Sequence, residues 1–172
     1  MKKVSLVLGV CGLLLAGGRF AFAGTGNPGS ACRGAFGGDQ GYVDTLGLTN
    51  VSGSDDTFEC LISVGTTSNQ TVSSGWLNFQ DESTTDPIQC TMYLTSTSGS
   101  QWFGATRYSC STGGGCADLT TTFTGNGWIG WGGSDLPGTS VYTMYNNSYT
   151  GYECTLPKYG ASYSYIFAYG VN

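Results

Sequence analysis

The heptapeptide GYECTLP, residues 151–157, sets a cysteine among residues that alternate between polar and apolar. The same frame occurs in FECLISV from residue 58 and in IQCTMYL from residue 88. Successive side chains of a β-strand point to opposite faces, so each cysteine shares a face with its large apolar neighbours. The residues predicted to face the core are Phe58, Cys60, Ile62, Ile88, Cys90, Met92, Tyr152, Cys154 and Leu156. We interpret these cysteines as structural, because a buried thiol is poorly accessible and the chain has no histidine to activate it.

The N-terminus has the layout of a secretory signal peptide. Two lysines precede an apolar run over residues 4–16, and a segment of small residues ends at Ala23. We expect cleavage after Ala23, which makes residues 1–23 the signal and places the mature protein in the periplasm or outside a bacterial cell. The apolar run is too short to span a membrane, and no membrane association is expected after cleavage.

Cleavage would leave six cysteines. An even number in an exported chain without histidine predicts three disulfides and no metal site. Cys110 and Cys116, in the segment CSTGGGC, are expected to close a glycine-rich loop. For the other four the preferred pairing is Cys60–Cys154 with Cys32–Cys90. The pairing Cys90–Cys154 with Cys32–Cys60 remains open, because a sequence does not choose among connectivities.

Composition predicts an all-β protein. The chain is rich in glycine, serine, threonine and tyrosine, which is typical of short strands and tight turns. Residues 24–40 are expected to form a glycine-rich lead-in, and residues 41–172 a single antiparallel β-sandwich of eight or nine strands. The dipeptide Asn126-Gly127 predicts a hairpin turn.

Within this class we prefer an immunoglobulin-like arrangement, a jelly-roll-like sandwich being the other form. Cys60 on an early strand, Trp76 on the next and the pair Tyr152-x-Cys154 near the end are similar to the inter-sheet bridge, core tryptophan and tyrosine–cysteine pattern of that fold.

The segments NVSGSDDTFECLI, DPIQCTMYLTSTSG, GYECTLP and YSYIFAYGV together resemble a loose group of uncharacterised small secreted bacterial proteins with a cysteine-stapled strand pattern. The resemblance covers most of the mature chain and implies fold and export. It supplies no catalytic residues, and the CSTGGGC and GWIGWGG segments depart from the pattern.

Candidate chemistry is sparse, and we expect neither a cofactor nor catalysis. Eleven acidic residues face three basic ones once the signal is removed, which excludes nucleic acid as a partner. A glycoside-active enzyme is the third hypothesis, since Asp81, Glu82 and Asp86 cluster in one loop. If Cys60 and Cys154 bridged opposite sheets, Glu59 and Glu153 would point away from each other and could not share a substrate.

The remaining candidates are Trp128 and Trp131 in GWIGWGG. Three positions apart on a strand, they would lie on opposite faces, so one ring is expected to be exposed, and the glycines around them predict a bulge or an open loop. The first functional hypothesis is a binding or adhesion module that holds a carbohydrate or a cell-surface protein through these residues and the Cys110–Cys116 loop. The alternative is a structural subunit that self-associates through strand edges, including the C-terminal segment SYIFAYGVN.

Overall fold

The computed structural model describes residues 25–36, 41–43, 46–63, 70–96, 98–118, 123–138, 142–144, 149–160 and 163–172. Most of their strands form two antiparallel sheets. Sheet A has the order β10 (Gly125–Gly132), β7 (Ser74–Asp81), β13 (Tyr165–Val171), β4 (Leu48–Asn50) and β3 (Gly41–Val43), and β1 (Thr25–Pro28) also pairs with β13. Sheet B has the order β2 (Arg33–Gly34), β5 (Asp56–Ser63), β12 (Tyr149–Leu156), β8 (Gln89–Thr95) and β9 (Gln101–Tyr108).

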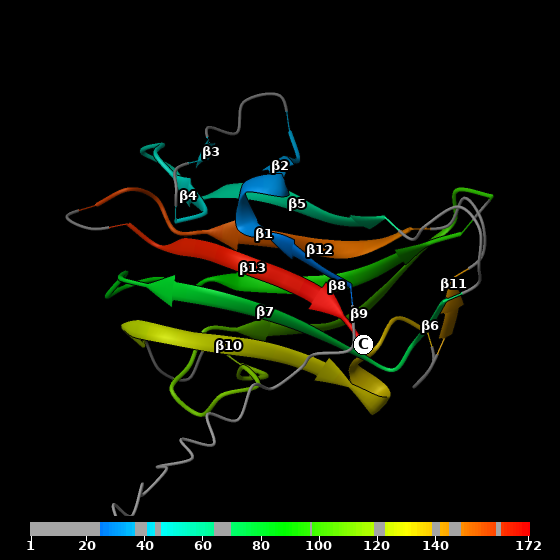
Figure 1. Cartoon of the computed structure of the whole chain (residues 1–172). Coiled ribbons are helices and arrows are strands. Elements are labelled where there is room, and N and C mark those ends of the chain that lie inside the picture. Colours follow the sequence, from blue (N-terminus) through cyan, green and yellow to red (C-terminus); the bar gives the residue numbers. More distant parts are fainter. Residues whose placement is uncertain are drawn as a thin grey trace, which may run out of the picture.

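The two sheets face each other as the layers of a sandwich (Figure 1). A further pair of short strands, β6 (Gln70–Val72) and β11 (Tyr142–Met144), lies at one end. The described helices are two short 3-10 turns, η1 (Gly29–Ala31) and η2 (Gly133–Asp135), and none in this part of the chain is long and apolar enough to cross a membrane. The predicted all-β sandwich is therefore confirmed.

The inward-facing residues of both sheets form one core. All nine residues of the cysteine frame are buried, as the alternation predicted. Two tyrosines connect the layers in opposite directions: the Tyr152 hydroxyl, from sheet B, donates to Gly170 O at 2.5 Å, and the Tyr169 hydroxyl, from sheet A, donates to Leu61 O at 3.0 Å. Both rings thus bury a large apolar area while their polar ends are satisfied.

The disulfides join Cys32 to Cys60, Cys90 to Cys154 and Cys110 to Cys116. The Cys110–Cys116 prediction is confirmed, but the preferred pairing of the other four is wrong and the alternative is the one observed. Cys90 and Cys154 are directly opposite each other on β8 and β12, with Cα atoms 4.1 Å apart. Facing residues on neighbouring antiparallel strands come this close when they do not exchange hydrogen bonds, so the bridge forms within a sheet.

The features that favoured an immunoglobulin-like arrangement have other roles. Cys60 and Cys154 lie on adjacent strands of sheet B, where Cys60 is opposite Tyr152, so they bridge no pair of sheets. Trp76 points to the outer face of sheet A, because it alternates with the buried Leu77. The buried ring that packs against Tyr152 is that of Trp131, with ring centroids 4.8 Å apart.

Three smaller expectations differ from the structure. The segment 24–40, expected to precede the sandwich, supplies β1 to sheet A and β2 to sheet B. Asn126 and Gly127 form no turn; they lie within β10, where pairing with Gln80 and Phe79 of β7 holds them extended. The C-terminal strand β13 has neighbours on both sides, so it presents no free edge for self-association.

A buried carboxylate, that of Asp81, lies at the C-terminal end of β7. Asp81 is fully buried, and its oxygens accept hydrogen bonds from the backbone N–H groups of Ser83 and Ile88 and from the hydroxyls of Ser109 and Ser164. Four donors on one carboxylate offset its loss of water. Asp81 therefore has a structural role and is not available to a substrate.

Candidate functional site

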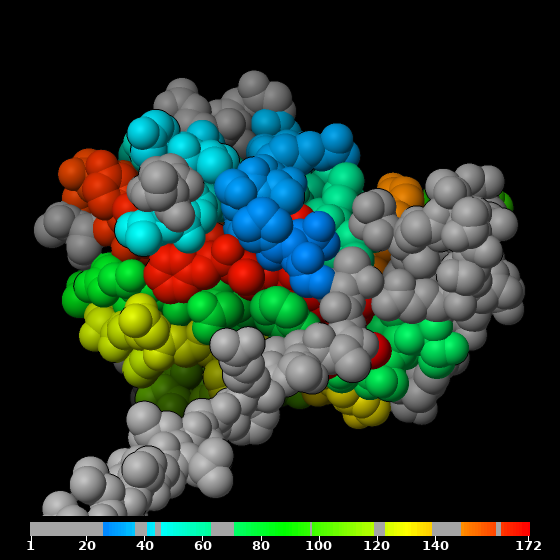
Figure 2. Space-filling model, viewed as in Figure 1, coloured from blue at the N-terminus to red at the C-terminus, as the bar shows by residue number. Residues whose placement is uncertain are grey.

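The outer face of sheet A carries a groove of about 710 Å³. Figure 2 shows this side of the molecule, where β13 (red), β7 (green) and β10 (yellow) follow one another. The groove is lined by residues of these strands and of the Cys110–Cys116 loop, without an ionisable side chain: Ser74, Gly75, Trp76, Asn78, Gly114, Trp128, Gly130, Trp131, Ala168 and Asn172. A concave, mostly apolar surface with aromatic rings and a few polar groups is the usual form of a small-molecule or glycan site.

The Trp128 indole lies against glycine backbone. A Cβ at Gly130 would be 2.5 Å from Trp128 Cζ3, and one at Gly113 would be 2.9 Å from Trp128 Nε1. Gly113 also has a φ of 64°, which favours glycine. The ring is 52% exposed, so the glycines support it on one side while leaving much of it open to solvent.

Trp76 lies on the same face in a similar way. It is partly buried, and a Cβ at Gly26 of β1 would be 3.1 Å from Trp76 Cζ2. Gly26 and Trp76 both pair with Gly170 of β13, from opposite sides, so the indole crosses a strand that has no side chain on this face at that point. Glycine at these positions lets both tryptophans lie close to the sheet.

The Cys110–Cys116 loop is attached to the outer edge of β10. The Gly114 N–H donates to Trp128 O, and the Gly130 N–H donates to Gly114 O, both at 3.1 Å. Cys116 exchanges two further backbone hydrogen bonds with Tyr108 of β9, each of 3.0 Å. The loop therefore covers the edge strand and holds one side of the groove in place.

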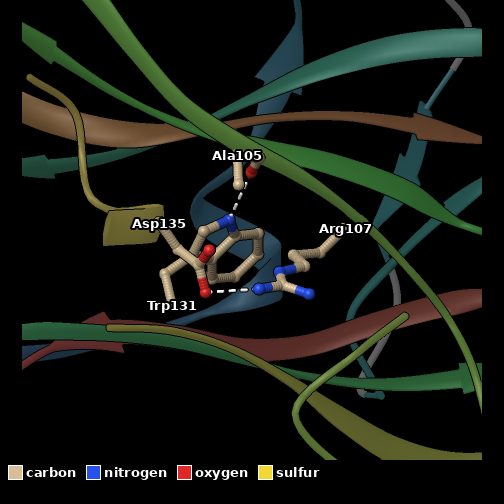
Figure 3. Close-up of polar contacts among 4 residues, drawn as sticks. All are labelled: Ala105, Arg107, Trp131 and Asp135. Atoms are coloured by element: carbon tan, nitrogen blue, oxygen red, sulfur yellow. Dashed lines mark hydrogen bonds and ion pairs between the residues drawn. The ribbon is translucent and has the colours of Figure 1, made fainter. Parts of the chain in front are cut away.

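Trp131 is 2% exposed and faces the interior (Figure 3). Its Nε1–H donates to Ala105 O of β9 at 2.7 Å, and beside it Arg107 forms an ion pair with Asp135 of η2. The prediction that one of the two tryptophans is exposed is confirmed, and the exposed one is Trp128. The prediction of a bulge or an open loop is wrong, because residues 125–132 form β10 and pair with β7 without a register shift.

Glu59 and Glu153 do not point away from each other, as the expected Cys60–Cys154 bridge between sheets required. The two are directly opposite each other on β5 and β12, on the outer face of sheet B, because Cys60 and Cys154 share a sheet. Glu59 forms a 3.2 Å ion pair with Arg33, and Glu153 is exposed. Neither lines the groove, so the pair lies on an open, solvated face.

Nothing in the described residues groups three or more histidine, cysteine, aspartate or glutamate side chains as a metal site. Comparison of the chain with protein-family models, with curated proteins and with solved structures finds no match. The site is therefore interpreted from its own geometry.

Sequence reasoning missed Trp76 as a surface residue, although the signal was present. In SGWLNFQD, residues 74–81, a period of two puts Trp76 with Ser74 and Asn78, opposite Leu77 and Phe79. The similarity to a core tryptophan of the immunoglobulin fold outweighed that local alternation.

Proposed function

We propose that this protein is an exported, non-catalytic binding module that holds a carbohydrate through the outer face of sheet A. The observation that carries the proposal is the half-exposed Trp128 ring, supported on glycine backbone beside a disulfide-closed loop. An exposed aromatic ring adds little to the stability of the fold, and such rings contribute strongly to binding when a ligand covers them. The pyranose ring of a sugar has an apolar C–H face that stacks on an indole.

Export is part of the proposal. Three disulfides are stable in an oxidising compartment, and the N-terminal segment that would direct export, residues 1–23, lies outside the described residues. The resemblance of the sequence to small secreted bacterial proteins also supports export.

A glycan array of the oxidised chain from residue 24 to residue 172 tests the function. Trp128→Ala should remove the array signal and leave the melting temperature nearly unchanged. Trp102→Ala is the matched control, because Trp102 is 45% exposed on β9 and does not line the groove. Equal loss of signal in both variants, or no signal for the unmodified chain, would count against carbohydrate binding.

Self-association as a structural subunit is the competing function. The strand edge that the sequence hypothesis named for it was the C-terminal segment, which lies inside sheet A and offers no edge. A size-exclusion run of the mature chain separates the two functions, since a binding module of this kind should elute as a monomer at micromolar concentration.

A further inference from the structure

The groove has two aromatic surfaces, which come from the neighbouring strands β10 and β7. The contacts of Trp128 with Gly130 of β10 and with Gly113 and Gly114 of the loop place its ring over the outer edge of β10. The contact of Trp76 with Gly26 places that ring over β13, toward β1. Strand β7 therefore lies between the two rings, one of which is over β10 and the other over β13. Neighbouring strands are about 4.8 Å apart, so ring positions separated by roughly two strands are on the order of 10 Å apart.

The groups between and beside the rings are neutral hydrogen-bonding groups. Asn78 Nδ2 donates to Gly127 O at 3.1 Å, and Asn172 Nδ2 donates to Ser74 Oγ at 3.2 Å. Asn172 Oδ1 is buried and accepts no hydrogen bond from the described residues. A hydroxyl-rich ligand suits amide and hydroxyl groups, whereas a carboxylate or sulfate ligand would meet no cation there.

We infer that the site takes a neutral, extended polysaccharide chain of β-1,4-linked, equatorially substituted sugars, with Trp128 and Trp76 as two separate stacking surfaces. This inference rests on the proposed function and gives its ligand class. A β-linked chain of this kind is a flat ribbon with C–H groups on its faces, so sugars two positions apart can cover both rings. An α-linked chain coils, and it does not present two such faces in one line.

Two separate stacking surfaces predict that affinity depends on the length of the oligosaccharide. We expect cellotetraose to bind the oxidised chain of residues 24–172 at least tenfold more tightly than cellobiose in isothermal titration, because only the longer ligand reaches both rings. In Trp128→Ala this difference should fall below about threefold. Trp102→Ala should behave as the unmodified chain does, and maltotetraose and β-1,4-linked tetraglucuronate should bind at least tenfold more weakly than cellotetraose.

Trp76→Ala should also remove the dependence on chain length, and its melting curve shows whether the fold survives. The Trp128→Ala comparison does not depend on that variant. Equal affinity for the di- and tetrasaccharide, or preference for the α-linked or the anionic ligand, overturns the inference. If Trp128→Ala still abolishes binding of another glycan in that case, the proposed function stands, whereas failure of every glycan to bind removes both.

Discussion

Strand β10 has one tryptophan on its inner face and one on its outer face, and the two rings differ in burial and in their contacts. The inner ring, Trp131, is buried against Tyr152, and its N–H is bonded to Ala105 O. The outer ring, Trp128, rests on glycine backbone and is half exposed. The comparison shows that residue type does not decide function here. A ring that is buried and whose N–H is hydrogen-bonded stabilises the fold. A ring that packs on the protein with one face only leaves its other face open for a ligand.

Removing the inner ring should have the largest effect. Trp131→Ala would leave a cavity in the core and is expected to lower the free energy of unfolding by about 3–5 kcal/mol. Trp128→Ala should lower it by less than about 1 kcal/mol, since little buried area is lost. Urea denaturation of both variants gives the two values. Similar losses would mean that the outer ring also contributes to the core.

Removing the long-range disulfide should mainly affect stability, whereas removing the short-loop disulfide should mainly affect binding. Replacing Cys90 and Cys154 by alanine opens a bridge with a sequence separation of 64 and should cost about 4 kcal/mol. Replacing Cys110 and Cys116 opens one with a separation of 6 and should cost about 2 kcal/mol.

The second double variant should nevertheless weaken glycan binding more than the first does at a temperature where both are folded. The reason is that Gly114 of this loop lines the groove and is hydrogen-bonded to the backbone of Trp128. Unchanged affinity after loss of Cys110–Cys116 would show that the loop does not position the outer ring. Thermal melting and titration of the two variants decide this.

The buried carboxylate of Asp81, at the end of β7, is a polar group that should also contribute to stability. Asp81→Asn keeps the size of the side chain but turns an N–H₂ group toward some of the four donors around it, so a loss of about 2–4 kcal/mol is expected. Asp86→Asn is the control in the same loop, because Asp86 is only partly buried, and it should change stability by less than about 0.5 kcal/mol. Chemical denaturation at neutral pH measures both; a small effect at Asp81 would contradict its structural role.

The smallest expected effect appears at high pH. Burial raises the pKa of Tyr169 from 10.0 to about 12, and burial also raises the pKa of Tyr93. The folded chain therefore holds these phenol protons more tightly than the unfolded chain does. Their contribution to stability is complete below pH 10 and is lost as the pH rises from 10 toward 12. Absorbance at the phenolate band should show exposed tyrosines ionising first, with buried ones following only as the fold is lost.

Local alternation predicted the composition of the core but not its connections. Period two correctly placed Phe58, Cys60 and the other members of the cysteine frame inside, because the face of a strand residue depends only on its position along the strand. The same rule does not hold along the whole of β13. A register shift between Ile166 and Ala168 reverses the alternation, so Ile166, Tyr169 and Val171 all face inward.

The sequence by itself determined the all-β class, the burial of the cysteines, the Cys110–Cys116 loop and the exposure of one of two tryptophans. Each of these depends on residues close together in the chain. The tertiary structure alone decided that Cys154 lies opposite Cys90, that Glu59 lies beside Glu153, and that Trp76 and Trp128 share one groove. These relations depend on which strands are neighbours, and that order results from the packing of the whole chain, with contacts such as Trp76 to Gly26 reaching across the strand between them.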